Sequence, residues 1–126
     1  MTKTVIQTSD APEAVGAYSQ AVSANGLVFC SGQIALTPGG SDRTTESVAD
    51  QTRQCLTNLQ AVLAEAGSSL DNAVKVTAFL IDMGDFGEFN EVYAEFFTGD
   101  VPARATVGVA ALPKGARVEV ECIALA

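Results

Sequence analysis

The chain has 126 residues, of which 48% are hydrophobic and 17% are charged. That length suits one domain over residues 1–126, and the apolar content excludes a disordered protein. The net charge is −8 and the seven Lys and Arg residues are scattered singly. We therefore expect no binding to nucleic acid, whose phosphates require clustered basic residues.

No apolar run is long enough to cross a membrane, and the N-terminal residues lack the apolar segment of a signal peptide. We therefore expect a cytoplasmic protein without membrane contact. The chain has no histidine, which excludes histidine-dependent triads and most zinc sites. Cys30, Cys55 and Cys122 lack metal-ligand spacing and fall in apolar segments, so we expect free, buried thiols and no metal site.

The first predicted elements are two strands and a long helix. Asn25-Gly26 is a typical two-residue turn and would join a strand over residues 21–24 to one over residues 27–31. After a polar loop, apolar residues recur at helical spacing over residues 46–66. Gly67 follows where a left-handed cap ends a helix.

The second half of the chain predicts a strand over residues 73–81, a helix over residues 86–97 and strands over residues 103–111 and 116–125. Asp85 would cap the second helix. The four residues from Leu112 to Gly115 suit a hairpin loop between the last two strands. This order predicts an α+β domain with two helices packed on one face of a sheet.

Both faces of the strand over residues 73–81 are largely apolar. One face carries Val74, Val76, Ala78 and Leu80, and the other carries Thr77, Phe79 and Ile81. Two helices cover only one face of a sheet, and soluble monomers rarely expose a large apolar surface. We therefore expect the second face to be buried against other copies of the chain, with a pocket at the seam between them.

The last two strands carry the residues most suited to chemistry. With the predicted hairpin, Arg104, Thr106, Glu119 and Glu121 would share one face of the sheet. There Arg104 could hold a carboxylate through its planar fork, and a glutamate could orient or deprotonate water. The alternative is a structural ion pair at a subunit seam, in which a protein carboxylate satisfies Arg104.

Three further places carry weaker signals. Asn90 falls within the apolar stripe of the second helix, where it either bonds a nearby loop or faces a pocket between helix and sheet. Tyr18 lies in an irregular segment after a glycine, which would expose its phenol. Ser31-Gly32 at a strand end would allow a ligand to approach bare backbone N–H groups.

The most specific motifs are Pro102-Ala103-Arg104 and Glu119-Val120-Glu121. Together with seven other segments, they resemble the RidA/YjgF family of reactive-intermediate (enamine/imine) deaminases over nearly the whole chain. These segments are residues 11–21, 31–34, 51–54, 58–59, 66–75, 90–97 and 111–118. Two positions depart from the family pattern: Thr106 stands where members often have Cys, and Ala35 where they usually have Pro.

The resemblance implies a chorismate-mutase-like α+β fold with a mixed sheet, and a homotrimer that forms through the open face of the sheet. It implies cofactor-free hydrolysis of reactive 2-imino acids or enamines, such as 2-aminoacrylate, to 2-keto acids and ammonia, at sites between subunits. By position, Arg104 corresponds to the arginine that holds the substrate carboxylate, Gly32 to a backbone N–H donor and Glu119 to the residue that positions the attacking water. Pocket-lining positions correspond to Tyr18, Ser31 and Asn90, and Thr106 can still line the pocket.

Two alternatives to the deaminase remain. A non-catalytic protein could bind a 2-keto acid or a similar carboxylate in the same pocket, and only turnover separates it from an enzyme. An RNA-cleaving translation inhibitor is an activity also attributed to relatives, which the net charge of −8 disfavours.

Overall fold

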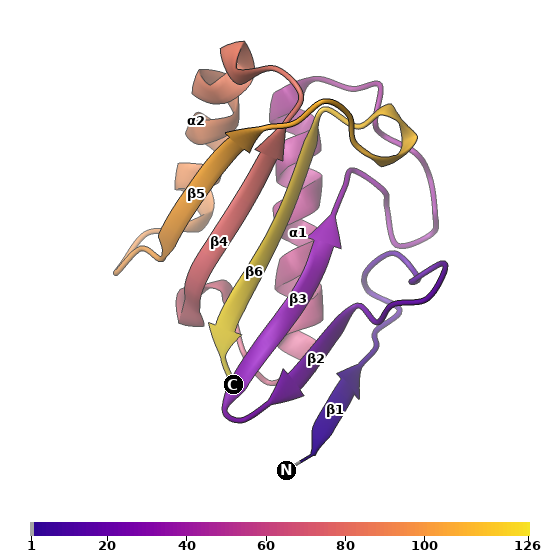
Figure 1. Ribbon diagram of the computed structural model, residues 1–126, viewed down its shortest axis with the longest axis vertical. Coiled ribbons are helices and arrows are strands. Elements are labelled where there is room, and N and C mark those ends of the chain that lie inside the picture. Colours follow the sequence, from indigo (N-terminus) through magenta and orange to yellow (C-terminus); the bar gives the residue numbers. More distant parts are fainter. Residues whose placement is uncertain (1) are drawn as a thin grey trace.

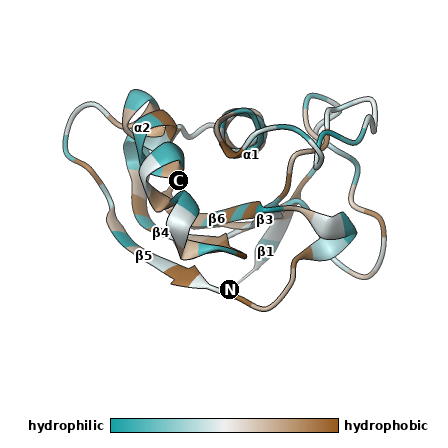
Figure 2. Cartoon of the chain, turned by 90° about the horizontal axis from the view of Figure 1, so that it is seen from above, coloured by the Kyte–Doolittle hydropathy of each residue, from teal (hydrophilic) through white to brown (hydrophobic). Residues whose placement is uncertain are grey.

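The computed structural model describes residues 2–126, which form one six-stranded sheet and two α-helices (Figure 1). The strands are β1 (Lys3–Ile6), β2 (Ala21–Ala24), β3 (Leu27–Gln33), β4 (Ala73–Leu80), β5 (Ala103–Gly108) and β6 (Val118–Leu125), and the helices are α1 (Val48–Glu65) and α2 (Phe86–Phe96). Both helices lie on one face of the sheet, and no helix of the described residues covers the other face (Figure 2). Neither α-helix is long and apolar enough to cross a membrane.

The local signals in the sequence form the expected elements. Asn25 and Gly26 both have positive φ, 56° and 82°, as a two-residue turn between β2 and β3 requires. The C-terminal end of α1 is capped by Gly67, whose φ is +78°. Beyond it, the Ser68 N–H donates to the Leu63 C=O at 2.8 Å. The α+β class with two helices on one face of a mixed sheet is confirmed.

One strand, β1, is not predicted by the sequence analysis. Three of its four residues are exposed, so its sequence shows no alternation of buried and exposed positions. It pairs antiparallel with β2 at one edge of the sheet.

The last two strands do not form the expected hairpin. β6 runs antiparallel between β3 and β4, whereas β5 pairs in parallel with β4 at the far edge of the sheet. The difference follows from burial. Val118, Val120, Cys122 and Ala124 of β6 are each at most 3% exposed, so this strand takes the centre of the sheet. β5 has no buried residue, and α2 supplies the crossover that a parallel pair requires.

One smaller expectation is wrong, and another holds only in part. Val74 does not join the buried row of β4, because the register against β6 shifts between Ala73 and Lys75 and leaves Val74 41% exposed. Asp85 occupies the N-cap position of α2 as predicted, but its side chain makes no capping hydrogen bond. Its carboxylate instead pairs with Arg117 at 3.0 Å.

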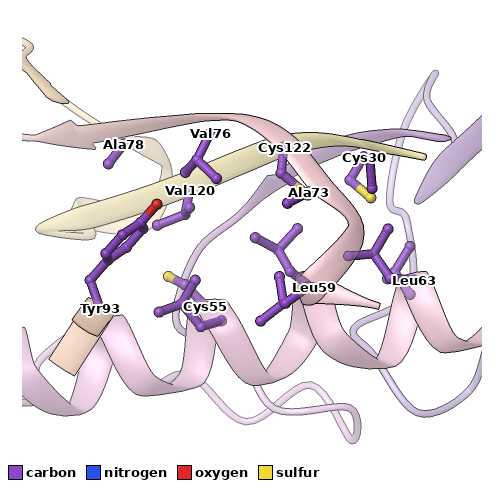
Figure 3. Close-up of a cluster of buried hydrophobic side chains, with 14 of the residues drawn as sticks. Cys30, Cys55, Leu59, Leu63, Ala73, Val76, Ala78, Tyr93, Val120 and Cys122 are labelled. Carbon is purple, nitrogen blue, oxygen red and sulfur yellow. The ribbon is translucent and has the colours of Figure 1, made fainter. Parts of the chain in front are cut away.

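The core lies between the helices and the sheet, where Cys55, Leu59 and Leu63 of α1 face the strands (Figure 3). Cys30 and Cys122 are direct partners on β3 and β6, and all three cysteines are buried with free thiols. Burial raises the pKa of Cys55. The hydrogen bond with Cys30 and burial together raise the pKa of Cys122, so both groups are protonated at neutral pH.

Candidate active site

Arg104 lies on the edge strand β5, on the face of the sheet that the helices cover. Its direct partner on β4 is the buried Val76. Its Nη1 donates a hydrogen bond to Asn90 Oδ1 at 2.8 Å, and its Cζ lies 4.5 Å from the centroid of the Tyr93 ring. Among residues 2–126 no carboxylate forms an ion pair with Arg104. Asn90 therefore binds this arginine rather than a loop, and the guanidinium keeps N–H donors for a ligand.

A cavity of about 380 Å³ opens beside this guanidinium. Its polar lining is Arg104, Asn90 and Tyr93, and its apolar lining is Ala94, Phe97, Val101 and Pro102. The volume is that of a small-molecule site. One cation next to an apolar wall suits a small carboxylate with a short apolar side chain.

Two buried hydroxyl groups, one on β5 and one on α2, form no hydrogen bond of good geometry among the described residues. They are Thr106 Oγ1 and the Tyr93 hydroxyl. Thr106 lies on the same face as Arg104 but does not line the cavity. Tyr93 falls within the apolar stripe predicted for the second helix, and the sequence analysis did not single it out. Its polar hydroxyl at a core position is the signal that marks it as more than a core residue.

Glu119 and Gly32 form a second cluster, on the uncovered face of the sheet. Gly32 lies in a bulge of β3, where the register against β6 shifts between Cys30 and Gln33. The Glu119 carboxyl lies directly over this backbone, because a Cβ built on Gly32 would stand only 2.9 Å from Glu119 Cδ. The missing side chain of Gly32 is thus the space that the carboxyl group occupies.

Ser31 ties this bulge to the segment that carries Tyr18. The Ser31 N–H donates to the Gln20 C=O at 3.0 Å, and its Oγ donates to the Ser19 C=O at 2.6 Å. Tyr18 itself is 53% exposed. The Ser31 hydroxyl is therefore engaged with the backbone, whereas the Tyr18 phenol is open to a ligand.

The surroundings of Glu119 stabilise its protonated form, so its pKa is higher than that of an ordinary glutamate. Partial burial raises its pKa, and the negative charge of Glu121 raises it further. A carboxylate with a raised pKa is a better proton acceptor, which suits a group that activates water.

The expected single-face cluster of Arg104, Thr106, Glu119 and Glu121 is wrong. Because β4 lies between β5 and β6, the last two strands do not set each other's register. Arg104 and Thr106 belong to the rows of Val76 and Ala78, on the helix-covered face, whereas Glu119 and Glu121 belong to the rows of Phe79 and Thr77, on the uncovered face. One chain therefore presents its cation and its carboxylates on opposite sides of the sheet.

Comparison with known proteins gives consistent results. Residues 8–126 match the family model described as endoribonuclease L-PSP. The chain is 48% identical over 121 residues to the 2-iminobutanoate/2-iminopropanoate deaminase of Rattus norvegicus, covering 96% of this chain and 88% of that protein. The structure matches the Rid family protein YyfA from Yersinia pestis with a TM-score of 0.95 at 46% identity, covering 99% and 100% of the two chains. It also matches E. coli TdcF with bound serine, with a TM-score of 0.90 at 40% identity and 98% coverage of each chain.

The contact between Gly32 and Glu119 predicts the effect of Gly32→Ala. The added methyl would displace the carboxyl group, which is the flexible end of a side chain, so the fold should persist. Moving that group toward solvent should lower the Glu119 pKa toward its ordinary value. A ¹³C NMR titration of the glutamate carboxyls measures this. Gly87→Ala is the matched control, because nothing lies within 4 Å of that position. An unchanged Glu119 titration in the Gly32 variant would contradict the contact.

Proposed function

Since the chain belongs to the endoribonuclease L-PSP family, which is the RidA/YjgF family, we propose that it hydrolyses 2-imino acids and enamines such as 2-aminoacrylate to 2-keto acids and ammonia. This would remove reactive metabolites before they damage other molecules. The observation that carries the proposal is Arg104, which has no carboxylate partner among residues 2–126 and lines a small cavity with Asn90.

Substrate binding is assigned to Arg104 and Gly32. The guanidinium would hold the substrate carboxylate through two parallel N–H bonds, while Asn90 occupies Nη1 on one side and fixes the plane. The Gly32 N–H would be a second donor. Tyr18 would line the pocket, as its exposure allows. Ser31 would fix the pocket wall through its hydrogen bonds to the backbone of residues 19 and 20, and Thr106 through its place on β5.

The chemical step requires no group beyond these residues and water. A protonated imine has an electrophilic C2, to which a water oxygen adds while Glu119 accepts a proton from that water. Glu119 passes that proton to the nitrogen of the resulting carbinolamine, the C–N bond breaks to release ammonia, and the hydroxyl proton returns to Glu119 as the C2 oxygen becomes a carbonyl. Protonated imine and water thus become keto acid, ammonia and one proton, which Glu119 releases to the ammonia or to solvent. Positioned acid–base assistance of this kind is typically worth ~10²–10⁴-fold.

The opposite faces of Arg104 and Glu119 support a site shared between chains. One substrate cannot touch both groups of the same chain, so we propose that Arg104 of one chain meets Gly32 and Glu119 of the next. The uncovered face of the sheet is suited to such a contact, because Phe29, Val107 and Leu125 on it are 43%, 40% and 50% exposed. A closed assembly of three chains, as the family resemblance implies, would contain three such sites.

The other two functions are weaker explanations. A non-catalytic carboxylate-binding protein would use the same residues, and E. coli TdcF was crystallised with serine. A function limited to binding, however, does not explain why a glutamate with a raised pKa lies beside Gly32. Ribonuclease activity is named in the family model, but a net charge of −8 with seven scattered bases is poorly suited to binding phosphates.

Arg104 and Glu119 should have separable roles. Arg104→Lys keeps the charge but loses the planar fork, so kcat/KM should fall at least ~10-fold and binding of pyruvate should weaken in parallel. Glu119→Gln cannot accept a proton, so kcat should fall while pyruvate binding stays within a few-fold. A coupled assay that follows keto-acid release from 2-aminoacrylate measures turnover. Arg53→Lys is the control, because that arginine forms an exposed pair with Glu95. Full activity of a folded Arg104→Ala variant would contradict the assignment of Arg104 to carboxylate binding.

A shared site predicts complementation between two inactive variants. Co-expressed Arg104→Ala and Glu119→Gln chains should recover activity, because some interfaces combine an intact arginine from one chain with an intact glutamate from the other. Equal, random mixing into trimers restores about a quarter of the sites. Light scattering should give the mass of three 13.0 kDa chains. If mixed trimers form and stay inactive, the shared site is wrong.

The effect of Glu121 on Glu119 predicts a shift in the pH profile. kcat/KM should fall as the pH drops through the Glu119 pKa, because only the ionised carboxylate accepts a proton. Glu121→Gln removes a negative charge that raises this pKa, so the acid limb should move to lower pH. Glu91→Gln, an exposed position on α2, should leave the profile unchanged. A limb that stays in place or moves upward in Glu121→Gln would exclude Glu119 as the titrating base.

A further inference from the structure

Three aromatic rings of α2 surround the Arg104 guanidinium. The centroids of the Phe86, Phe89 and Tyr93 rings lie 5.5, 5.9 and 4.5 Å from its Cζ. Positions 86, 89 and 93 fall on one face of a helix, so a single element presents all three rings to β5. Asn90 lies on the same face and accepts the hydrogen bond from Nη1. These four side chains form a cage for the cation, which is the arrangement that cation–π attraction favours.

Tyr93 is the member of this cage whose ring lies nearest to the guanidinium. It is 6% exposed, and its ring stacks on Phe97 at 4.4 Å and contacts Phe89 at 5.5 Å between centroids. Contacts with Phe97 and Phe89 restrict the movement of the ring. The ring therefore offers a surface against which the long side chain of Arg104 can settle in one orientation.

We propose that Tyr93 is a positioning residue, which holds the Arg104 guanidinium in the orientation that receives the substrate carboxylate, with Phe86 and Phe89 closing the cage. This rests on the proposed function of Arg104. An unrestrained arginine loses rotamer freedom when it binds a ligand, whereas a guanidinium already fixed by rings and an amide does not. The cage should thus strengthen carboxylate binding without taking part in the chemical step.

The cage consists of neutral groups, and this matters for binding. Burial raises the pKa of Tyr93, against the opposing effect of the Arg104 charge, so its phenol is neutral at neutral pH. A carboxylate in the same place would form an ion pair with Arg104 and compete with the substrate. Among the described residues the Tyr93 hydroxyl makes no hydrogen bond of good geometry, although a side-chain interaction with Arg104 also opposes the rise in its pKa, so the ring, whose centroid lies 4.5 Å from Cζ, makes the main contact. Tyr93→Phe should therefore preserve most of the effect.

The test compares Tyr93→Leu with Tyr93→Phe and with Phe96→Leu. Phe96 also packs against the core from α2 but is not among the rings around Arg104. Tyr93→Leu should raise KM and the dissociation constant for pyruvate by about 3- to 30-fold, with kcat within about 3-fold of wild type. Phe96→Leu should resemble wild type in all three quantities, and Tyr93→Phe, which keeps the ring, should lie much closer to wild type than Tyr93→Leu in KM and pyruvate binding. A folded Tyr93→Leu protein with unchanged KM and pyruvate binding, or with a loss in kcat alone, would overturn the proposal.

A spectroscopic measurement keeps this test separate from the proposed activity. Ring currents should shift the Arg104 side-chain Hε signal upfield in ¹⁵N-correlated spectra of the wild type, and Tyr93→Leu should return it toward its ordinary position. If the wild type shows no turnover, the deaminase proposal fails, and this shift together with pyruvate binding still decides for or against the cage. If Tyr93→Leu does not fold, Phe86→Leu replaces it, since Phe86 is only partly buried. An Hε signal that is unshifted in the wild type overturns the cage in either case.

Discussion

The position of β6 in the middle of the sheet is the constraint on which the rest of the molecule depends. Its alternate residues Val118, Val120 and Cys122 are almost completely buried beneath the helices, which requires strands on both sides. β3 and β4 supply them. This strand order places Glu119 over Gly32 on β3, and it leaves β5 at the edge of the sheet, paired with β4. The location of both candidate site clusters thus follows from the burial of one strand.

Buried amides stabilise the loops around this sheet. The Gln51 side chain donates to the Glu46 C=O at 2.8 Å and accepts from the Arg117 N–H at 3.0 Å, so it joins the two connections at one end of the sheet. The Gln20 side chain donates to the Pro12 C=O at 2.8 Å and thereby holds the segment that leads to Tyr18. A buried backbone group without a partner costs roughly 1–3 kcal/mol. These glutamines are therefore structural, although their polarity alone would admit a role in ligand binding.

The sequence predicted those features that depend on neighbouring residues. The turn at Asn25-Gly26, the cap at Gly67 and the apolar stripe of α2 were all recognisable, because each is fixed within a few residues. The pairing of the last strands was not, because a loop of hairpin length is compatible with either a hairpin or a return into the centre of the sheet. Only the burial of β6 relative to β5 decides between them, and that depends on residues far away in the chain. The site residues were singled out by their chemistry and position, and the resemblance supplied their roles, but their faces could not be assigned without the strand order.

The separation of Arg104 from Glu119 within one chain has a chemical consequence. If the two shared a face at bonding distance, they would form an ion pair, which would lower the Glu119 pKa and fill the donors of the arginine. Instead, Arg104 is surrounded by neutral groups, and the charge that acts on the Glu119 pKa is the negative charge of Glu121. Each group therefore keeps the capacity that the proposed reaction needs: free N–H donors in one case and proton affinity in the other. In a site shared between chains, the distance between them is set by subunit contact rather than by either strand. Residues of that contact surface would then control turnover as strongly as those that touch the substrate.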